Sequence, residues 1–379
     1  MQIRICEDEM KKILLEDCCE ILDSQRVPIT ATNRAEGPYP YYGANGVQDY
    51  VDDYIFDDEL VLLAEDGGNF GSKTKPIAYR VSGKCWVNNH AHVIKPKNRI
   101  DVDFLCYSLM FYNTDGLVNG ATRQKLTQAT MRKMLIPDLS KEQQLDIVNQ
   151  LNRIVEIRNL RLKEIQKLDE LIKARFVELF GDVVLNDKHW ETQEFSKVTD
   201  SRLGKMLDAK RQTGQSSFPY LANANVQWFR FEVDCLNEMD FNEAEQKEFA
   251  LEEGDLLVCE GGEIGRCAIW HNQVQPCFFQ KALHRVRCKQ GTILPDYLAW
   301  WFKFNCENNG FTAIEGAKAT IAHLPGAKLK KLRVVIPPLS LQNQFADFVT
   351  QVDKSKAAVQ KALDETQLLF DSLMQEYFG

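Results

Sequence analysis

Loops rich in amide and aromatic side chains are the part of this chain best suited to chemistry with another molecule. Asn and Gln can pair with two edge atoms of adenine, and Arg or Lys with guanine, when loops present them in the major groove of DNA. Such residues gather at 39–46, 69 and 88–90 in the first half and at 220–227 and 280–281 in the second. For any single residue, a plain turn built from Asn and Gly is the simpler interpretation. The candidates for DNA contacts are Tyr41, Tyr42, Asn45, Asn69, Asn88, Asn89, His90, Asn223, Asn225, Gln227, Gln280 and Lys281.

Two stretches that hold cations but no acidic residue form a second candidate feature. They run over residues 116–137 and 316–346, at matching places in the two halves. Their cations could follow the phosphates of a nucleic acid, or they could be ordinary lysines on a solvated loop. The repetition makes the first interpretation as good as the second, although the net charge of −8 argues against a broadly basic surface. These candidates are Arg123, Lys125, Lys318, Lys328, Lys330 and Lys331.

Catalytic and cofactor motifs are missing from the sequence. It contains no GxxxxGK[ST] phosphate loop, no dinucleotide fingerprint and no Asn/Asp-Pro-Pro-aromatic tetrad that would hold a flipped base in an amino-methyltransferase. Glu245-Gln246-Lys247 has a spacing seen in nucleases, but so short a triplet arises by chance. His90-Ala91-His92 could hold a metal, yet only His92 has a counterpart in the second half, which favours a strand histidine. We therefore predict no catalytic residue, no metal site and no cofactor in this chain.

The two halves of the sequence repeat one another. Ile136-Pro137-Asp138-Leu139-Ser140 returns as Ile336-Pro337-Pro338-Leu339-Ser340, and the run after each motif ends on Phe-Gly. The offset drifts from 192 (His92 to His284) to 200 (Ile136 to Ile336), so the halves share a fold while their loops differ. Two copies of one fold with different loop residues suit a protein that reads two halves of one target. Further matches are Cys85 with Cys277, Lys95 with Arg287, Lys97 with Lys289, and Gly67-Gly68 with Gly261-Gly262.

A long run with few helix breakers follows each Ile-Pro motif. Side chains there recur at alternating steps of three and four, which predicts two helices of about 40 residues, or about 60 Å each. Ser140 with Gln143 has the form of a capping box, Ser340 marks the second start, and Gly181 stands where a helix would stop. Two matching stripes favour an intramolecular coiled coil over single helices packed on their own domains. The stripes are Val148, Leu151, Val155, Arg158, Leu162, Ile165, Asp169, Ile172, Phe176 and Leu179, and Phe345, Val349, Val352, Lys356, Val359, Leu363, Thr366, Phe370, Leu373 and Tyr377.

Short strands separated by Gly, Pro and Asn turns are expected before each long helix. The sequence therefore predicts an α+β fold: two duplicated domains of short strands and loops, separated by two long antiparallel helices. The expected strands are 60–63, 77–81, 92–94, 255–259, 267–270 and 283–288, with short helices at 103–112 and 296–304. The expected domains are 1–139 and 183–338, with a central helix at 140–182 and a C-terminal helix at 339–379.

Length and composition fit a soluble protein with two globular parts. A chain of 379 residues exceeds one typical core, and its hydrophobic content of 44% is ordinary. No apolar run approaches the ~18 residues of a membrane span, and no signal peptide opens the chain, so we expect a cytoplasmic protein without membrane contact. The eleven cysteines include no CxxC pair and are expected to be free thiols.

Taken together, these motifs resemble the DNA-specificity subunit of type I restriction-modification systems. The resemblance spans essentially the whole chain. It rests on the order and spacing of the two Ile-Pro-x-Leu-Ser helix starts, the paired glycine loops, residues 41–46 and the two Phe-Gly ends. It implies two target-recognition domains, each reading one half of a bipartite sequence in double-stranded DNA, and two conserved helices that act as a spacer.

The same resemblance implies that catalysis belongs to partner subunits. Two methyltransferase (modification) subunits would dock on the helices, and restriction (endonuclease/translocase) subunits would complete the complex. S-adenosylmethionine, ATP and Mg²⁺ would bind to those partners. The missing catalytic motifs agree with this expectation.

Two other functions stay open from the sequence. One is a coiled-coil scaffold with two protein-binding modules, and the other is a nuclease or methyltransferase with unrecognised motifs. A DNA reader loses affinity steeply as salt rises, a scaffold ignores DNA, and an enzyme modifies DNA alone.

Overall fold

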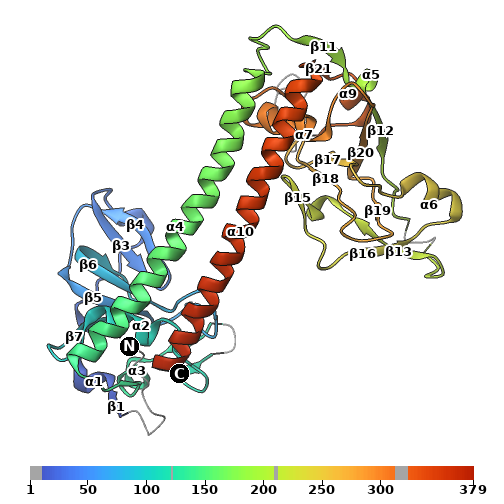
Figure 1. The fold of residues 1–379 in the computed structure, drawn as a ribbon. Coiled ribbons are helices and arrows are strands. Elements are labelled where there is room, and N and C mark those ends of the chain that lie inside the picture. The colour runs from blue at the N-terminus through green and yellow to red at the C-terminus, as the bar shows by residue number, and fades with distance from the viewer. Residues whose placement is uncertain (1–10, 121–122, 209–211, 312–322) are drawn as a thin grey trace. The chain divides into compact units, whose positions relative to one another are not determined.

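The computed structural model describes residues 11–120, 123–208, 212–311 and 323–379. The fold is α+β, with two β-rich domains that alternate along the chain with two long helices (Figure 1). Contacts divide the chain into Met1–Lys163 with Gln360–Gly379, which we call unit 1, and Glu164–Val359, which we call unit 2. Each unit therefore holds one β-rich domain and one end of each long helix.

Unit 1 is built on a six-stranded sheet with the order β2-β7-β5-β6-β3-β4. Its neighbouring strands are antiparallel except β3 and β6, which are parallel. Leu60 to Ala64 in β5 have no exposed surface, and such an unbroken apolar run is typical of a strand covered on both faces. The strands of this sheet are β2 (Cys19–Ile21), β3 (Tyr39–Gly43), β4 (Gly46–Val51), β5 (Phe56–Ala64), β6 (Ala78–Val87) and β7 (Ala91–Pro96).

Short elements complete the β-rich part of unit 1. Helix α2 starts where the Asp101 carboxylate accepts hydrogen bonds from the N–H groups of Asp103 and Phe104, at 3.0 and 3.1 Å. The remaining elements are β1 (Lys12–Leu14), α1 (Leu15–Cys18), η1 (Asp23–Gln25), η2 (Ala31–Asn33), α2 (Val102–Met110), β8 (Val118–Asn119), β9 (Lys125–Leu126), α3 (Gln128–Arg132) and β10 (Leu135–Pro137).

Unit 2 carries its strands in several smaller sheets. A four-stranded antiparallel sheet has the order β12-β20-β17-β18, and a three-stranded sheet has the order β16-β13-β19. The strands are β11 (Glu191–Glu194), β12 (Thr199–Leu203), β13 (Ser217–Leu221), β14 (Val226–Gln227), β15 (Arg230–Phe231), β16 (Asn237–Asp240), β17 (Leu256–Cys259), β18 (Cys267–Ile269), β19 (Phe278–Phe279), β20 (Leu283–Cys288) and β21 (Arg333–Ile336). The short helices are α5 (Phe195–Val198), η4 (Asn223–Asn225), α6 (Glu243–Phe249), α7 (Pro295–Glu307) and α9 (Gly326–Lys330).

The expected elements of both halves are present. To within one residue, the predicted strands fall inside β5, β6 and β7 of unit 1 and coincide with β17, β18 and β20 of unit 2. The two predicted short helices are α2 and α7. The duplication also shows in pairing that the sequence did not reveal. In each half, the strand before the long helix pairs antiparallel with the first strand of that half, β10 with β1 and β21 with β11.

The long helices α4 (Lys141–Phe180) and α10 (Leu339–Phe378) have 40 residues each. The capping box is confirmed: the Ser140 hydroxyl accepts from the Gln143 N–H at 3.3 Å, and the Gln143 side chain accepts from the Ser140 N–H at 3.0 Å. Gly181 ends α4 with a φ of 73°, which favours glycine. Helix α10 begins at Leu339, the first residue of the expected C-terminal helix and one before Ser340, and the Pro338 carbonyl accepts its first N–H groups.

Both units show α4 and α10 packed antiparallel. In unit 1, Tyr377 near the end of α10 donates to Gln150 near the start of α4 at 3.1 Å. In unit 2, Lys356 in the first half of α10 pairs with Asp169 in the second half of α4 at 2.7 Å. The predicted intramolecular helix pair is confirmed.

The predicted stripe is wrong at one position of α4. Leu162 is 45% exposed, and Arg161 faces α10 instead. The Arg161 guanidinium donates to the Ala362 carbonyl and the Thr366 hydroxyl. A straight α-helix drifts by about 20° per heptad relative to a 3.5-residue repeat, and this drift brings the neighbouring residue into the contact.

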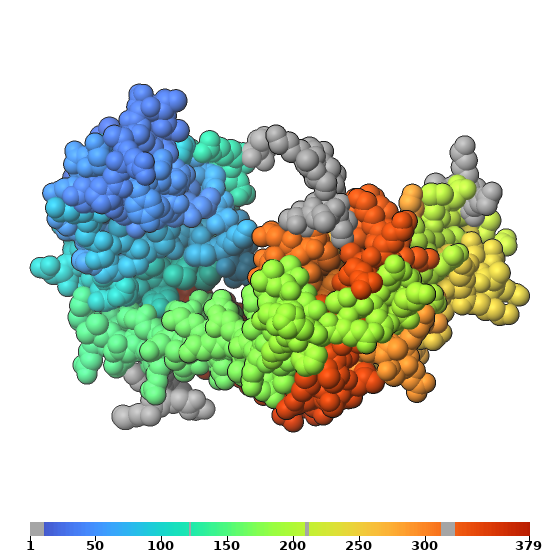
Figure 2. Space-filling model, turned by 90° about the horizontal axis from the view of Figure 1, so that it is seen from above, coloured from blue at the N-terminus to red at the C-terminus, as the bar shows by residue number. Residues whose placement is uncertain are grey.

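Each unit has a core that includes the ends of both long helices. In unit 2, Phe176 of α4 has no exposed surface and contacts the rings of Phe180, Tyr297 and Phe345, with centroids 5.0, 5.8 and 5.4 Å away. Helix α7, orange in Figure 2, accordingly lies alongside the green α4. In unit 1, Leu151 of α4 and Phe370 of α10 belong to the core beneath α2. No helix among the described residues has the length and apolar character needed to cross a membrane.

Candidate nucleic-acid interface

In unit 1, two of the predicted amides meet on a glycine loop. The loop follows β5, and Gly67 within it has a φ of 64°, a conformation that side chains rarely adopt. The Asn45 amide donates to the Gly67 carbonyl at 3.0 Å, and the Asn69 amide donates to the Asn45 side-chain oxygen at 3.1 Å. Asn45 and Asn69 come from different turns, so the fold joins them into one polar surface.

A charged cluster borders these amides. The Asp66 carboxylate accepts from the Arg123 guanidinium, and the His90 Nδ1 lies 2.8 Å from the same oxygen. Lys125 pairs with Glu65 at 3.0 Å. The structure therefore brings His90, Arg123 and Lys125 together, although the sequence placed them 35 residues apart at most.

The other first-half candidates divide by exposure. Tyr41 is 1% exposed, and its hydroxyl contacts the backbone of Ile29. Asn88 is 3% exposed and bonds to the Gln48 side chain and the His90 N–H. These two buried side chains stabilise the loops by their hydrogen bonds. Asn89 is exposed, and Tyr42 is half-buried.

The corresponding loops of unit 2 hold their amides more tightly. The Asn223 amide donates to the Gly261 carbonyl at 3.3 Å, and Arg266 donates to the Asn223 carbonyl at 3.0 Å. Asn225 bonds to Glu232 and Ala222, and Gln227 bonds to Ala224. Each of these three candidates thus has a local structural role.

The remaining second-half candidates are mostly exposed cations. The Lys281 ammonium is exposed and lies 3.9 Å from the Met206 sulfur, while Gln280 beside it is half-buried. Lys328 and Lys330 are exposed on α9, and Lys331 is exposed directly after it. Lys318 lies outside the described residues.

Beneath both loop surfaces lies the same backbone frame. The Leu126 N–H donates to the Glu65 carbonyl at 2.7 Å, and the Leu324 N–H donates to the Glu260 carbonyl at 2.6 Å. His92 Nε2 lies 2.9 Å from the Leu126 carbonyl, and His284 Nε2 lies 3.0 Å from the Leu324 carbonyl. The sequence match of the two histidines therefore reflects one shared structural position.

Sequence reasoning missed the residues that complete this frame. Asp23 lies 2.6 Å from His92 Nδ1 in unit 1, and nothing in the sequence singled it out. Gln144 and Gln342 are fully buried and tie the starts of the long helices to the loops before α2 and α7. The matched position of the two glutamines in the repeats is the signal that could have found them.

Asp23, Glu65 and His92 offer three possible metal ligands within 4.8 Å of one another. Two cations already compensate this group, because Arg26 and Lys125 contact Glu65 at 2.7 and 3.0 Å. Burial alone would raise the pKa of Glu65, but the hydrogen bonds from Arg26 and Lys125 hold it below its ordinary value. We therefore assign the group to the internal frame of unit 1.

Comparison with known proteins decides the family. The family model for the type I restriction modification DNA specificity domain matches residues 7–170 and 187–366. A Haemophilus influenzae protein named as a type I restriction enzyme specificity subunit is 28% identical over 370 residues, which are 96% of this chain and 92% of that protein. The chain belongs to the type I restriction modification DNA specificity family. It is a DNA specificity subunit of a type I restriction-modification system, and such subunits are non-catalytic and carry no cofactor themselves.

Solved structures show the same fold. The crystal structure of a type I restriction-modification S subunit from M. genitalium covers 100% of this chain and 98% of its own, with a TM-score of 0.58 and 13% identity. A chain from a structure on complex assembly and conformational transition of the type I R-M system covers 97% of both chains, with a TM-score of 0.60 and 14% identity. These likenesses show the fold, and the family match supports assembly of the specificity subunit within a type I complex with DNA.

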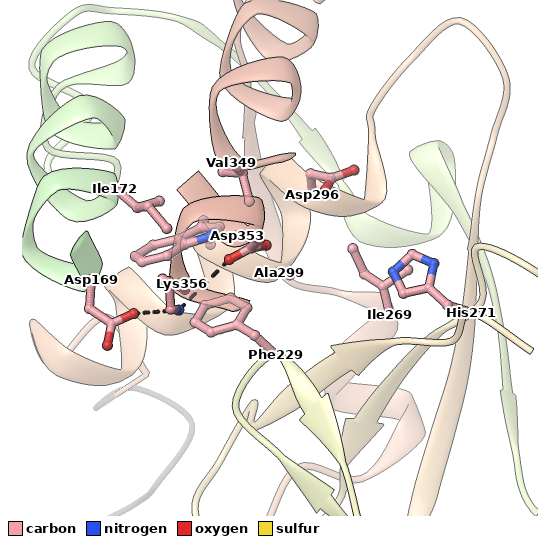
Figure 3. Close-up of a pocket in the computed structure, with 11 residues that line it drawn as sticks. Asp169, Ile172, Phe229, Ile269, His271, Asp296, Ala299, Val349, Asp353 and Lys356 are labelled. Carbon is pink, nitrogen blue, oxygen red and sulfur yellow. Dashed lines mark hydrogen bonds and ion pairs between the residues drawn. The ribbon is translucent and has the colours of Figure 1, made fainter. Parts of the chain in front are cut away.

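A small cavity of about 90 Å³ in unit 2 of the specificity subunit lies among α4, α7 and α10 (Figure 3). Lys356 extends into it between Asp169 and Asp353, with contacts of 2.7 and 3.7 Å. Burial raises the pKa of Asp296 on the opposite side. Because Lys356 bridges the two helices here, we interpret the cavity as part of helix packing.

The buried His284 makes the stability of unit 2 depend on pH. Burial, with help from His323 and Lys330, lowers the pKa of His284 below its ordinary 6.5, while the Leu324 carbonyl and Glu260 act in the opposite direction. The unfolded chain therefore binds this proton more readily than the folded one. The stability that unit 2 has with neutral His284 is therefore fully present above pH 6.5. It is lost as the pH falls toward the lower pKa that His284 has in the folded state.

We expect the natural chain to lose its advantage in free energy of unfolding over His284→Gln as the pH falls. The difference in their free energies of unfolding should be largest above pH 6.5 and fall by up to about 1.4 kcal/mol per pH unit below it. Chemical denaturation at pH 7.5, 6.5 and 5.5 measures this difference. His271→Gln, at an exposed histidine, serves as the control. A difference that grows as pH falls would contradict the prediction.

Proposed function

We propose that each unit of this specificity subunit reads one half of a bipartite sequence in double-stranded DNA. The observation that carries the proposal is that both units repeat the same backbone and histidine contacts while the side chains next to these contacts differ. Glu65, His92 and Leu126 in unit 1 make the same contacts as Glu260, His284 and Leu324 in unit 2. A shared frame with unlike surfaces is what reading two different half-sites requires.

In this proposal, residues 1–139 and 183–338 are the two recognition domains. Exposed and half-buried side chains on and beside the loops would contact bases. The main candidates are Asn45, Asn69, Asn89 and His90 in unit 1, and in unit 2 Lys281 and Gln227, whose amide also bonds to Ala224. The lysines at 328, 330 and 331 would contact phosphates. The long helices, at 140–182 and 339–379, would separate the domains along the DNA.

The proposed partners are two methyltransferase subunits docked on the helices and the restriction subunits of the complex, in the cytoplasm. The partners would supply S-adenosylmethionine, ATP and Mg²⁺ chemistry. The chain's own part would be to bind the target and hold those subunits over it.

Salt dependence of DNA binding tests the phosphate contacts. Lys330 and Lys331 are exposed, and neither has a carboxylate partner among the described residues, so both ammonium groups can meet phosphates. We expect Lys330→Ala with Lys331→Ala to weaken binding of the assembled complex to all sequences alike. The slope of log K against log salt should become shallower by about 2.

Lys247→Ala, which removes an exposed lysine of α6, is the control and should leave the slope unchanged. If the double variant has the same slope of log K against log salt as the natural chain, Lys330 and Lys331 do not contact phosphates. A complex that binds no DNA at any salt concentration would contradict the proposed function itself and favour a protein scaffold.

A further inference from the structure

The two copies of the frame differ at two residues next to it. Asp66 and Gly261 occupy equivalent places, since each forms a bridge to the residue before the matched leucine, Lys125 or His323. The structure therefore matches Gly261 with Asp66, whereas the sequence alone suggested Gly67. His90 and Ala282 are equivalent too, because their carbonyls accept from the N–H groups of Glu65 and Glu260 at 2.9 Å. Unit 1 thus mounts an acid and a histidine where unit 2 has a glycine and an alanine.

The acid and the histidine hold one arginine. The Nη2 atom of Arg123 donates to Asp66 Oδ1 and lies 3.3 Å from His90 Nδ1. The Arg123 side chain is nevertheless 59% exposed. A Cβ at Gly67 would lie 3.4 Å from the Arg123 Nε, in ordinary van der Waals contact, so the guanidinium packs closely against the loop at this glycine. Arg123 is therefore both fixed in direction and open to a ligand.

The local charge favours a base edge over a phosphate. Arg123 and Lys125 stand beside Asp66 and Glu65, so these four side chains sum to zero charge. A phosphate that approached Arg123 would also meet the Asp66 carboxylate, which repels it. A guanine edge carries no net charge and offers the O6 and N7 acceptors that match the guanidinium fork. The amides of Asn45 and Asn69 lie on the same loop and extend this neutral, hydrogen-bonding surface.

We propose that Arg123 reads a guanine in the first half-site through O6 and N7, and that Asp66 is the residue that positions it. This inference rests on the proposed function and deepens it, since it names the base and the reader. It also predicts an asymmetry. Gly261 cannot orient an arginine, so no guanine requirement of this kind arises from the equivalent place in unit 2.

The test measures binding of the complex, assembled with its methyltransferase subunits, to the natural site and to sites with one base pair changed. The natural complex should discriminate against loss of one guanine in the first half-site. In Arg123→Ala we expect this discrimination to fall by about 5- to 140-fold, the range of one good bidentate pair. Preferences at every other position, including the second half-site, should stay the same.

Three more variants separate base reading from charge. Arg123→Lys keeps the charge but lacks the planar fork, so the guanine preference should weaken while the salt slope stays unchanged. Asp66→Asn should weaken the same preference at only a small cost in thermal stability, since the Arg123 side chain of this pair is 59% exposed although that of Asp66 is 16% exposed. Lys133→Ala, at an exposed cation of the same acid-free stretch, should leave the base preference intact.

Two results would overturn the inference. The first is an Arg123→Ala complex that binds all sequences uniformly more weakly, with a salt slope shallower by about 1, as for a phosphate contact. The second is an Arg123→Ala complex with natural preferences throughout. In both cases a natural complex that still reads two half-sites would leave the proposed function standing, whereas a natural complex without sequence preference would contradict that function.

Discussion

Phe176→Ala destabilises unit 2 by about 3–5 kcal/mol, the range for removing a large buried aromatic side chain. Phe176 has no exposed surface and contacts five rings, from α4, α7 and α10. Its removal leaves a cavity at the place where the two long helices and α7 meet. The neighbouring rings of Trp300 and Phe345 already contact each other at 6.1 Å, so the site cannot easily collapse.

Urea denaturation followed by hydrogen exchange measures this effect and locates it. Exchange should speed up in α7 and in the adjoining ends of α4 and α10, with little change in the six-stranded sheet of unit 1. Val177→Ala changes the next residue, which is 41% exposed, and should cost well under 1 kcal/mol. Equal losses in both variants would show that Phe176 does not organise this core.

Gln342→Ala should cost about 2–4 kcal/mol, because it leaves several buried backbone groups without partners. The Gln342 side chain accepts from the Leu294 N–H at 2.8 Å and donates to the Pro337 carbonyl at 2.8 Å, and it has no exposed surface. Gln342→Glu should also destabilise, since a carboxylate cannot donate to the carbonyl. Thermal and urea unfolding of the full chain measure both variants.

Gln344→Ala is the matched control, because Gln344 is exposed and lies two residues after Gln342 in α10. This variant should be nearly neutral. The repeat supplies a second comparison. Gln144 makes the same kinds of contact in unit 1, with the Asp101 N–H at 2.8 Å and the Leu139 carbonyl at 2.9 Å. Gln144→Ala should therefore speed exchange in unit 1 instead. A neutral Gln342→Ala would contradict the role assigned to this glutamine.

Much of the fold could be predicted because its signals are local or repeated. The stripe from Phe345 to Tyr377 follows helical periodicity, and the Ser140–Gln143 capping box and Gly181 mark ends by backbone chemistry. The sequence is less informative where an apolar residue and its polar neighbour could both face the partner helix. Arg161 faces α10 in place of Leu162 because helical drift, and a long side chain that can reach a carbonyl, override apolarity.

The candidate interface was harder to predict because exposure is set by tertiary packing. Tyr41 and Asn88 have residue types suited to base contacts, yet the fold buries both. Asp66 is an unremarkable acid in the sequence and gains its role only because Arg123 lies beside it, 57 residues further along the chain. Gln144 and Gln342 look like ordinary helix-surface residues. Their matched positions in the repeats mark them in the sequence, but packing against a loop is what buries them.

The central claim, that each unit reads its own half-site, is tested most directly by sequencing methylated DNA. Cells would carry the methyltransferase partner with the natural chain, with a unit 1 variant (Asn45→Ala, Asn89→Ala, His90→Ala) or with a unit 2 variant (Gln227→Ala, Lys281→Ala). We predict that the natural chain directs methylation to a bipartite motif with a constant gap. Each variant should relax only one half of that motif, and the two variants should relax different halves. Relaxation of both halves by the unit 1 variant, or an unchanged motif in cells without the chain, would contradict the account.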